Sequence, residues 1–233
     1  MDKIPNEELP DEAPSFSHFL PRRAEVEATH RYLPHWHLDG GLYFVTWRLA
    51  DSLPQSMLAQ WREERRLWLE KHPKPWSEET REAYQREFPR RIEAWLDAGY
   101  GACVLRDPAC ASILAQVMLR FDGERYDMAS FVVMPNHVHA LFQLRGETRL
   151  EDLLKAWKGT SAREINQRLG QRGTLWMDES RDTSIRNPEH LVRCYGYIRE
   201  NPVNAGLCDG EFLYYERQGI ECQMREWSGD VDE

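Results

Sequence analysis

The chain has 233 residues, is 41% hydrophobic and carries a formal net charge of −9, a composition that can form one substantial core or a core with an insertion. It contains no apolar run approaching the roughly 20 residues that cross a bilayer, and its acidic start, MDKIPNEELPDEAP, lacks the basic and apolar regions of a signal peptide. We therefore expect a cytoplasmic protein with no membrane partner, which excludes the membrane-spanning and secreted classes. The five cysteines form no C-x-x-C pair and are expected to be reduced thiols: Cys103, Cys110, Cys194, Cys208 and Cys222.

Most of the negative charge is concentrated at the two ends of the chain. Residues 1–29 hold seven acidic and three basic residues, and residues 209–233 hold eight acidic and two basic residues. Removing these segments leaves a net charge of +1 on residues 30–208. The charge pattern predicts a nearly neutral folded domain at residues 30–208, between acidic tails at residues 1–29 and 209–233.

The first part of this domain predicts a strand followed by a helical insertion. Residues 41–49, GLYFVTWRL, are rich in β-branched and aromatic residues and follow a turn at the two glycines 40–41. Residues 52–99 instead carry aromatic and aliphatic residues at helical spacing, broken at residues 72–76 and again at Pro89. We expect this segment to be an insertion of helices in an otherwise α+β domain.

A helix and a β-hairpin are predicted next. Asp107 and Pro108 are a typical cap and first residue of a helix. Residues 128–134 form an apolar strand, and Pro135 and Asn136 are turn residues. The following strand, which begins at His137, is therefore expected to run antiparallel to residues 128–134.

Two further helices complete the predicted fold. Thr148 with Glu151 has the spacing of a capping box, and Gly170 ends the apolar periodicity of that helix. Asn187 with Pro188 begins the second helix. Together these elements predict an α+β fold in which an antiparallel sheet has helices packed on one face.

A His-x-His pair lies on the predicted central strand. Side chains alternate along a strand, so His137 and His139 should point to one face while Val138 points into the core. Imidazole nitrogens bind divalent metals, and two of them on a rigid strand form most of a small coordination site. His35 and His37 share the spacing, but they lie among proline and glycine residues where a loop is expected, so we treat them as a decoy.

Tyr197 and Asn201 are four residues apart on the second predicted helix, which puts a phenol and an amide oxygen on one face. A metal beside a tyrosine hydroxyl suits attack on a phosphate, because the cation draws charge from the phosphoryl oxygens. Pro202 disfavours helical geometry at Asn201. The amide is therefore expected at a frayed or kinked helix end. There it either turns towards a metal or no longer lies on the same helix face as Tyr197.

Basic residues gather at residues 145–175, where seven basic and four acidic side chains occur. Such a segment is either an ordinary solvated helix face or a surface that follows a phosphate backbone. The candidates for contacts to DNA are Arg149, Lys155, Lys158, Arg163 and Arg172.

The residues around both motifs resemble a known family. MPNHVHALF at residues 134–142, followed by YIRENPVNAGL at residues 197–207, resembles the REP-associated tyrosine transposases, which are single-tyrosine HUH endonucleases related to the insertion-sequence-200-like transposases. The resemblance covers most of residues 31–208 and also includes, in order, GGLYFVTWRLADSLP (40–54), LRDP (105–108), RFDGERYDMASFVVMPNHVH (120–139), KAWKGTSAREIN (155–166) and LWMDESRDTSIRNPEHL (175–191).

This resemblance implies a ferredoxin-like sheet with the tyrosine helix lying across a metal site. It implies that His137 and His139 bind Mg²⁺ or Mn²⁺, that Asn201 is the third ligand and that Tyr197 is the nucleophile. It further implies a transposase that cleaves and rejoins single-stranded, hairpin-flanked DNA through a 5′-phosphotyrosine. The sequence leaves the oligomeric state open between a monomer and a homodimer.

Two other functions fit the same residues. The first is a regulator that binds nucleic acid sequence-specifically on this fold without catalysis, in which case Tyr197 would be dispensable. The second is a metal-dependent hydrolase with water as nucleophile, which needs a base. The candidate bases, Asp178, Glu179 and Asp182, are expected in a loop, and Asp182 could instead help to position the metal or the tyrosine.

Overall fold

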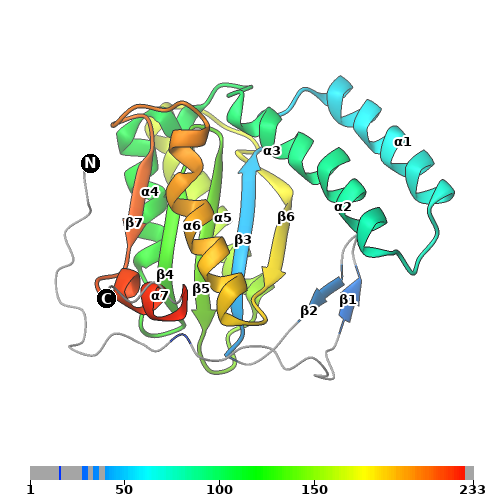
Figure 1. The fold of residues 1–233 in the computed structure, drawn as a ribbon. Coiled ribbons are helices and arrows are strands. Elements are labelled where there is room, and N and C mark those ends of the chain that lie inside the picture. The colour runs from blue at the N-terminus through cyan, green and yellow to red at the C-terminus, as the bar shows by residue number, and fades with distance from the viewer. Residues whose placement is uncertain (1–15, 17–27, 31–33, 37–39, 229–233) are drawn as a thin grey trace.

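A five-stranded antiparallel sheet forms the centre of the protein, for which a computed structural model describes residues 16, 28–30, 34–36 and 40–228 (Figure 1). The strand order is β6-β3-β5-β4-β7, and every neighbouring pair is antiparallel. The strands are β3 (Leu42–Leu49), β4 (Tyr126–Val133), β5 (His137–Leu144), β6 (Trp176–Ser184) and β7 (Leu213–Glu216). A separate two-stranded sheet pairs β1 (Ala28–His30) with β2 (Pro34–Trp36).

Helices lie between and beside these strands. They are α1 (Gln55–Lys71), α2 (Glu78–Glu87), α3 (Pro89–Asp97), a 3₁₀ turn η1 (Val104–Arg106), α4 (Pro108–Leu119), α5 (Leu150–Leu169), α6 (Pro188–Asn204) and α7 (Ile220–Ser228). No helix in the ranges that the structure describes is both long and apolar enough to span a membrane.

The chain order β3-α4-β4-β5-α5-β6 combined with the spatial order β6-β3-β5-β4 is the ferredoxin-like βαββαβ arrangement. The predicted α+β class and antiparallel sheet are therefore confirmed. Two additions follow this unit: α6 crosses the sheet, and β7 extends the sheet beyond β4.

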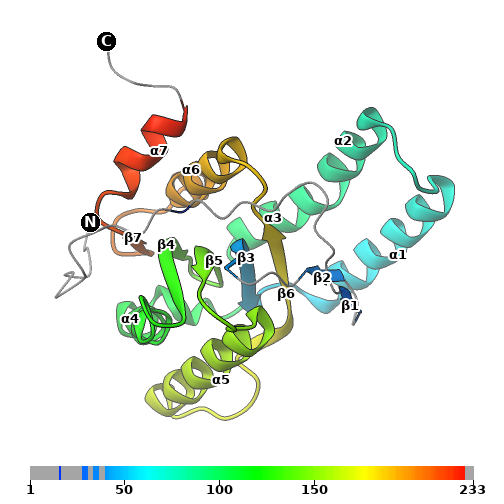
Figure 2. The same cartoon turned by 90° about the horizontal axis from the view of Figure 1, so that it is seen from below.

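The sheet has an apolar core on each face. Every residue of β4 and β5 is buried, so both faces must be covered. On one face α4 and α5 pack over residues such as Trp47, Val138 and Phe142. On the other, α6 and α7 pack over Val132 and Leu141, and Figure 2 shows α5 and α6 on opposite sides of the sheet. The sequence predicted helices on one face only. α4 and α5 form that layer, and α6 and α7 form a second layer on the other face.

The helical insertion predicted at residues 52–99 is confirmed as α1, α2 and α3. α1 and α2 project past the β6 edge of the sheet, and α3 leads back to it (Figures 1 and 2). They carry a small core of their own, which consists of Leu53, Leu58 and Leu96. Trp68 packs its ring against Tyr84 and Phe88, which joins α1 to α2.

The predicted C-terminal tail at residues 209–233 is wrong for its central part. β7 pairs with β4, and the Tyr215 ring stacks on Phe131 with centroids 5.0 Å apart. α7 then packs Ile220 and Met224 against the α6 side of the sheet. A tail was predicted because acidic residues dominate the composition of residues 209–233 and the apolar strand β7 within them is short. In the predicted N-terminal tail, Phe16 is also buried, and the other residues of 1–27 lie outside the described part.

Two helix starts agree with the prediction and one differs. Asp107 accepts a hydrogen bond from Ala109 N at the start of α4, and Asn187 accepts one from His190 N at the start of α6. The capping box predicted at Thr148 does not form. Thr148 N donates to the Arg145 carbonyl in the turn after β5, so the chain enters α5 later, at Leu150, and without a side-chain cap.

Candidate metal and tyrosine site

β5 holds the two candidate metal-binding histidines at the centre of the sheet, between β3 and β4. Val138 is fully buried in the core under α4 and α5, while His137 and His139 lie on the other face and are 1% and 2% exposed. Their ring centroids are 4.8 Å apart. The predicted alternation along this strand is therefore confirmed.

The structure describes only part of the second His-x-His pair, His35 and His37. The backbone of Pro34–Trp36, which includes His35, forms the strand β2 rather than the expected loop, because it pairs with β1. His37 lies outside the described residues.

α6 brings Tyr197 and Asn201 over the histidines. Leu191 and Ile198 anchor the helix in the apolar core beneath it. The Tyr197 ring meets the His139 ring edge to face, with centroids 5.1 Å apart. Asn201 is 2% exposed, and its side chain is near enough to His137 and Tyr197 to raise the pKa of the first and lower the pKa of the second. The structure thus brings together all four residues that the two sequence motifs singled out.

Pro202 does not end α6. The helix continues to Asn204, and Ala205 N donates to the Asn201 carbonyl at 3.0 Å. The expected frayed end at Asn201 is therefore wrong. Helical geometry preserves the shared face of Tyr197 and Asn201.

Two buried polar atoms at this site have no hydrogen-bond partner: Nε2 of His139 and Oδ1 of Asn201. Nδ1 of His139 lies 2.7 Å from Thr46 Oγ1, so its second nitrogen is the one left for a ligand. A buried acceptor without a partner is costly, and a cation would satisfy both atoms. Two imidazoles and an amide oxygen therefore fit a divalent metal. Among the described residues no set of three His, Cys, Asp or Glu side chains forms such a site.

Burial keeps both histidines neutral. It lowers the pKa of His137 to about 3, although the contact with Asn201 opposes this shift. It lowers the pKa of His139 well below the usual value, to which the neighbouring His137 and Arg181 also contribute. Neutral imidazole is the form that binds a metal.

Tyr197 is a neutral phenol in this environment. Burial raises its pKa most, followed by the nearby carboxylates of Glu93 and Asp97, whereas Arg181 and the contact with Asn201 lower it. Burial and the neighbouring Glu93 raise the pKa of Asp97 to about 6. The phenol therefore needs a local positive charge or a proton acceptor before it can act as a nucleophile.

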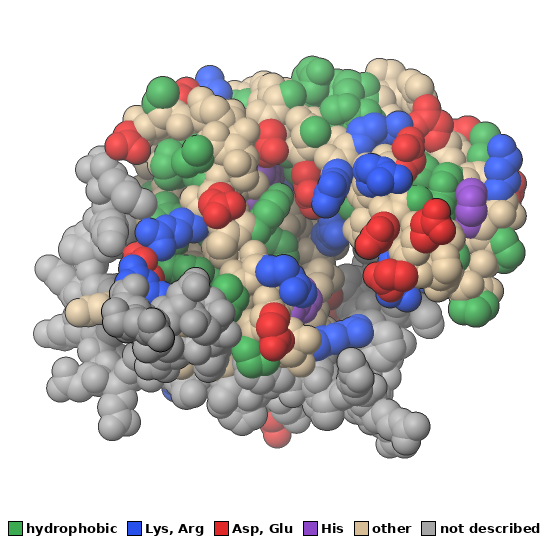
Figure 3. Space-filling model, in the orientation of Figure 1, with side chains coloured by type: hydrophobic (Ala, Val, Ile, Leu, Met, Phe, Trp, Pro, Cys, Tyr) green, Lys and Arg blue, Asp and Glu red, His purple; other side chains and the backbone are tan. Residues whose placement is uncertain are grey.

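The charged side chains near Tyr197 were not identified from the sequence as part of the site. Glu93 and Asp97 lie one helical turn apart on α3 of the insertion, and Arg181 lies on β6, where it forms an ion pair with Glu93 at 3.2 Å. Figure 3, which looks onto the face crossed by α6, shows Lys and Arg side chains mixed with acidic ones between α6 and the insertion. The spacing of Glu93 and Asp97 was the only indication in the sequence, and no sequence pattern placed these two residues near Tyr197.

The acidic residues considered as bases lie on a strand, not in a loop. Asp178, Glu179 and Asp182 all belong to β6, which is held in register by β3. Asp182 pairs with Val45, whose side chain is in the core on the α5 side of the sheet. Residues directly opposite in a sheet share a face, so Asp182 is directed away from the histidines and does not position the metal or Tyr197.

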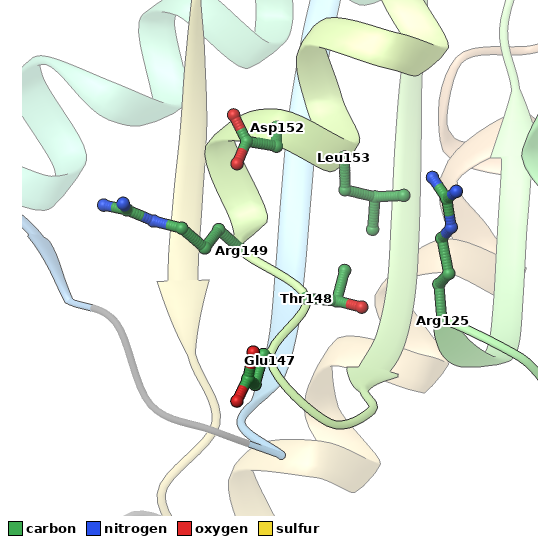
Figure 4. A pocket seen from close by; sticks show the side chains of 6 residues that line it. All are labelled: Arg125, Glu147, Thr148, Arg149, Asp152 and Leu153. Carbon is green, nitrogen blue, oxygen red and sulfur yellow. The ribbon is translucent and has the colours of Figure 1, made fainter.

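The basic residues proposed for DNA lie on or beside α5, across the sheet from Tyr197. Lys158 donates to the carbonyls of Met177 and Asp178, and burial lowers its pKa to about 8. Arg163 is 74% exposed. Figure 4 shows Arg149 and Arg125 on opposite sides of a hollow at the start of α5, which is lined by Arg125, Glu147, Thr148, Arg149, Asp152 and Leu153.

Fold and site together define an α+β protein of the ferredoxin-like type in which a buried His-x-His pair faces a helical tyrosine. Residues 106–201 match the family model described as Transposase IS200 like. The matched segment contains all four site residues. The family resemblance stated from the sequence is thereby confirmed.

Two solved structures are similar to this chain. The REP-associated tyrosine transposase bound to a REP hairpin is 16% identical, with 77% of this chain and 76% of that chain covered and a TM-score of 0.45. A candidate transposase from Deinococcus radiodurans R1 is 15% identical, with 75% and 98% covered and a TM-score of 0.37. No curated protein matches the sequence.

Proposed function

We propose that the protein is a single-tyrosine DNA strand transferase that cleaves and rejoins single-stranded, hairpin-flanked DNA through a 5′-phosphotyrosine intermediate. The observation that carries this proposal is the edge-to-face packing of Tyr197 on His139, beside the unpartnered buried atoms Nε2 of His139 and Oδ1 of Asn201. This arrangement supports a metal site and a nucleophile that act at the same phosphate. The proposed setting is the cytoplasm, with the protein as a monomer or a homodimer.

His137, His139 and Asn201 would hold the divalent ion, Mg²⁺ or Mn²⁺. When bound, the ion supplies positive charge that polarises the scissile phosphate. The unpartnered buried atoms and the neutral state of both histidines support this assignment. An amide oxygen suits a hard cation, and imidazole makes Mn²⁺ a good occupant as well as Mg²⁺.

In the proposed reaction the Tyr197 oxygen attacks phosphorus. A bond forms between that oxygen and phosphorus, the bond from phosphorus to the 3′ oxygen breaks, and the leaving 3′ oxygen takes up a proton as the phenol loses one. Asn201 and Arg181 favour the phenolate, because both lower the pKa of Tyr197. The 3′ hydroxyl can later attack the phosphotyrosine and rejoin the strands, since the covalent link conserves the cut bond.

An unpaired strand is the expected substrate. Tyr197 is half-buried on a fixed helix and must meet phosphorus in line with the leaving oxygen. A single strand can adopt that geometry more easily than a stacked duplex can. The proposal is tested by incubating labelled hairpin-flanked single strands with the protein and Mg²⁺ or Mn²⁺. Cleavage supports it, whereas tight binding without cleavage on any member of a hairpin panel favours the non-catalytic regulator.

Asn201→Ala is expected to raise the Mn²⁺ concentration for half-maximal cleavage by at least about tenfold, because the site loses one oxygen ligand. Excess Mn²⁺ should restore part of the rate. Asn201→Asp offers a charged oxygen of similar reach and should keep metal binding with an altered preference between Mg²⁺ and Mn²⁺. Titrations of both metals against cleavage rate measure these effects. If both variants only lower the melting temperature and leave half-saturation unchanged, Asn201 is a structural residue.

Lys155→Ala and Arg163→Ala are expected to weaken hairpin binding and to lower its salt dependence, if α5 follows the DNA backbone. Both side chains are exposed on α5. Removing one side chain that neutralises a phosphate should reduce the slope of log affinity against log salt by roughly 0.7–0.9. Arg66→Ala is the control, because its charge is already paired with Glu63 and Glu70 on α1. Equal slopes in all four proteins would assign the α5 charges to solvent.

A further inference from the structure

Asn136 connects a candidate metal ligand to the helical insertion. It lies in the turn between β4 and β5 and is fully buried. Its Oδ1 lies 2.8 Å from Nδ1 of His137, and its Nδ2 donates to the carbonyls of Leu96 and Tyr100, each at 3.1 Å. Those carbonyls belong to the end of α3 and to the loop that follows it.

These three contacts fix the protonation of His137. Nδ2 of Asn136 is the only end of the amide that can donate, and two carbonyls receive its hydrogens. The amide therefore cannot flip, and Oδ1 must face the imidazole. An amide oxygen only accepts, so Nδ1 of His137 carries the proton and the lone pair is on Nε2.

His139 is oriented by a different element. Its Nδ1 contacts Thr46 Oγ1 on β3, which is a strand of the sheet itself. The two histidines thus have separate orienting partners, one from the sheet and one that depends on the insertion. A change at Asn136 can therefore be distinguished from a general disturbance of the site.

The loop that presents the Tyr100 carbonyl is held firmly. Ala102 N donates to Asp51 Oδ2 at 2.7 Å. Gly101 packs so closely on Asp51 that an added Cβ would lie 2.6 Å from the Asp51 carbonyl oxygen. This close approach, at a φ of +89°, requires glycine and keeps the loop against the start of the insertion.

We propose that Asn136 is a positioning residue that fixes His137 as the Nδ1–H tautomer, and that the end of the insertion, through the Leu96 and Tyr100 carbonyls, fixes Asn136 in turn. The insertion thereby sets the affinity of the site for its metal. The metal part of this inference rests on the proposed function, whereas the tautomer part does not. Partners that orient a ligating histidine typically change metal affinity by about 10–100-fold.

The tautomer of each histidine can be measured in the metal-free protein by long-range ¹H–¹⁵N NMR. Wild type should show His137 protonated at Nδ1 only. Asn136→Ala should give protonation at Nε2 or a mixture at His137 and leave His139 unchanged. Thr46→Val should do the reverse. Asn166→Ala is the matched control, because Asn166 also donates to a carbonyl, that of Gly173, far along α5 from the site, and it should change neither ring.

Asn136→Asp separates the two halves of the contact. Aspartate keeps an acceptor for His137 but loses both donors to the insertion, so the tautomer should be retained while thermal stability falls. An unchanged His137 in Asn136→Ala, or identical spectra for the Ala and Asp variants, overturns the proposal.

Mn²⁺ affinity, measured by calorimetry without DNA, should fall about 10–100-fold in Asn136→Ala and stay near wild type in Asn166→Ala. Equal affinities overturn the role of the insertion in metal binding. Absence of Mn²⁺ binding by wild type overturns the proposed metal site, while the NMR result still decides the tautomer.

Discussion

Tyr197→Phe is expected to abolish the covalent protein–DNA adduct, with a fall in cleavage rate of about three orders of magnitude or more. The substitution removes only the nucleophilic oxygen. The ring contacts with His139 and Phe44 survive, so the fold and DNA binding should be retained. The measurement is a denaturing gel of protein incubated with labelled hairpin DNA and Mn²⁺.

Tyr195→Phe is the matched control for this experiment. Tyr195 is two residues away and is also buried on α6, but its hydroxyl donates to Glu216 at 3.0 Å. That bond directs it towards β7 and away from the histidines, and the variant should form the adduct at the wild-type level. An adduct that survives in Tyr197→Phe and disappears in Tyr195→Phe would reverse the assignment.

His137→Ala and His139→Ala are each expected to lower cleavage by about 10²–10⁴-fold and to change hairpin affinity only a few-fold. Each removes a proposed metal ligand, whereas backbone phosphates and basic side chains provide most of the affinity. Single-turnover cleavage and gel shift measure the two quantities on the same proteins. Because both rings are buried, a melting curve accompanies each variant.

His35→Ala and His37→Ala are the controls with the same His-x-His spacing, and both should keep cleavage. The choice between the two pairs depends on the central position of β5 and on the tyrosine that packs against His139. Losses of similar size at both pairs would show that this choice is unsound.

Local sequence patterns predicted the parts of the site that single elements determine. The period of two along β5 placed Val138 in the core and both histidines on the other face. The four-residue spacing on α6 placed Tyr197 and Asn201 together, and helical packing of Leu191 and Ile198 turned that face to the sheet. Asn187 and Asp107 capped their helices as expected.

The parts that depend on tertiary contacts could not be predicted. Glu93 and Asp97 lie near Tyr197 only because the insertion folds back along the sheet edge. The role of Asn136 depends on carbonyls 36 and 40 residues earlier in the chain, while its sequence context indicated only a turn. The orientation of Asp182 also depends on a tertiary contact, since the register of β6 on β3 decides which face of the sheet it occupies.

The central claim, that Tyr197 is the residue joined to DNA, is tested most directly by mass spectrometry of the adduct. Trypsin cleavage after Arg193 and Arg199 releases residues 194–199, CYGYIR, which contain both α6 tyrosines. Fragmentation then assigns the attached 5′-phosphonucleotide to one of them. We predict the modification on Tyr197 alone. Attachment at Tyr195, or on a peptide from any other part of the chain, would contradict the proposed site.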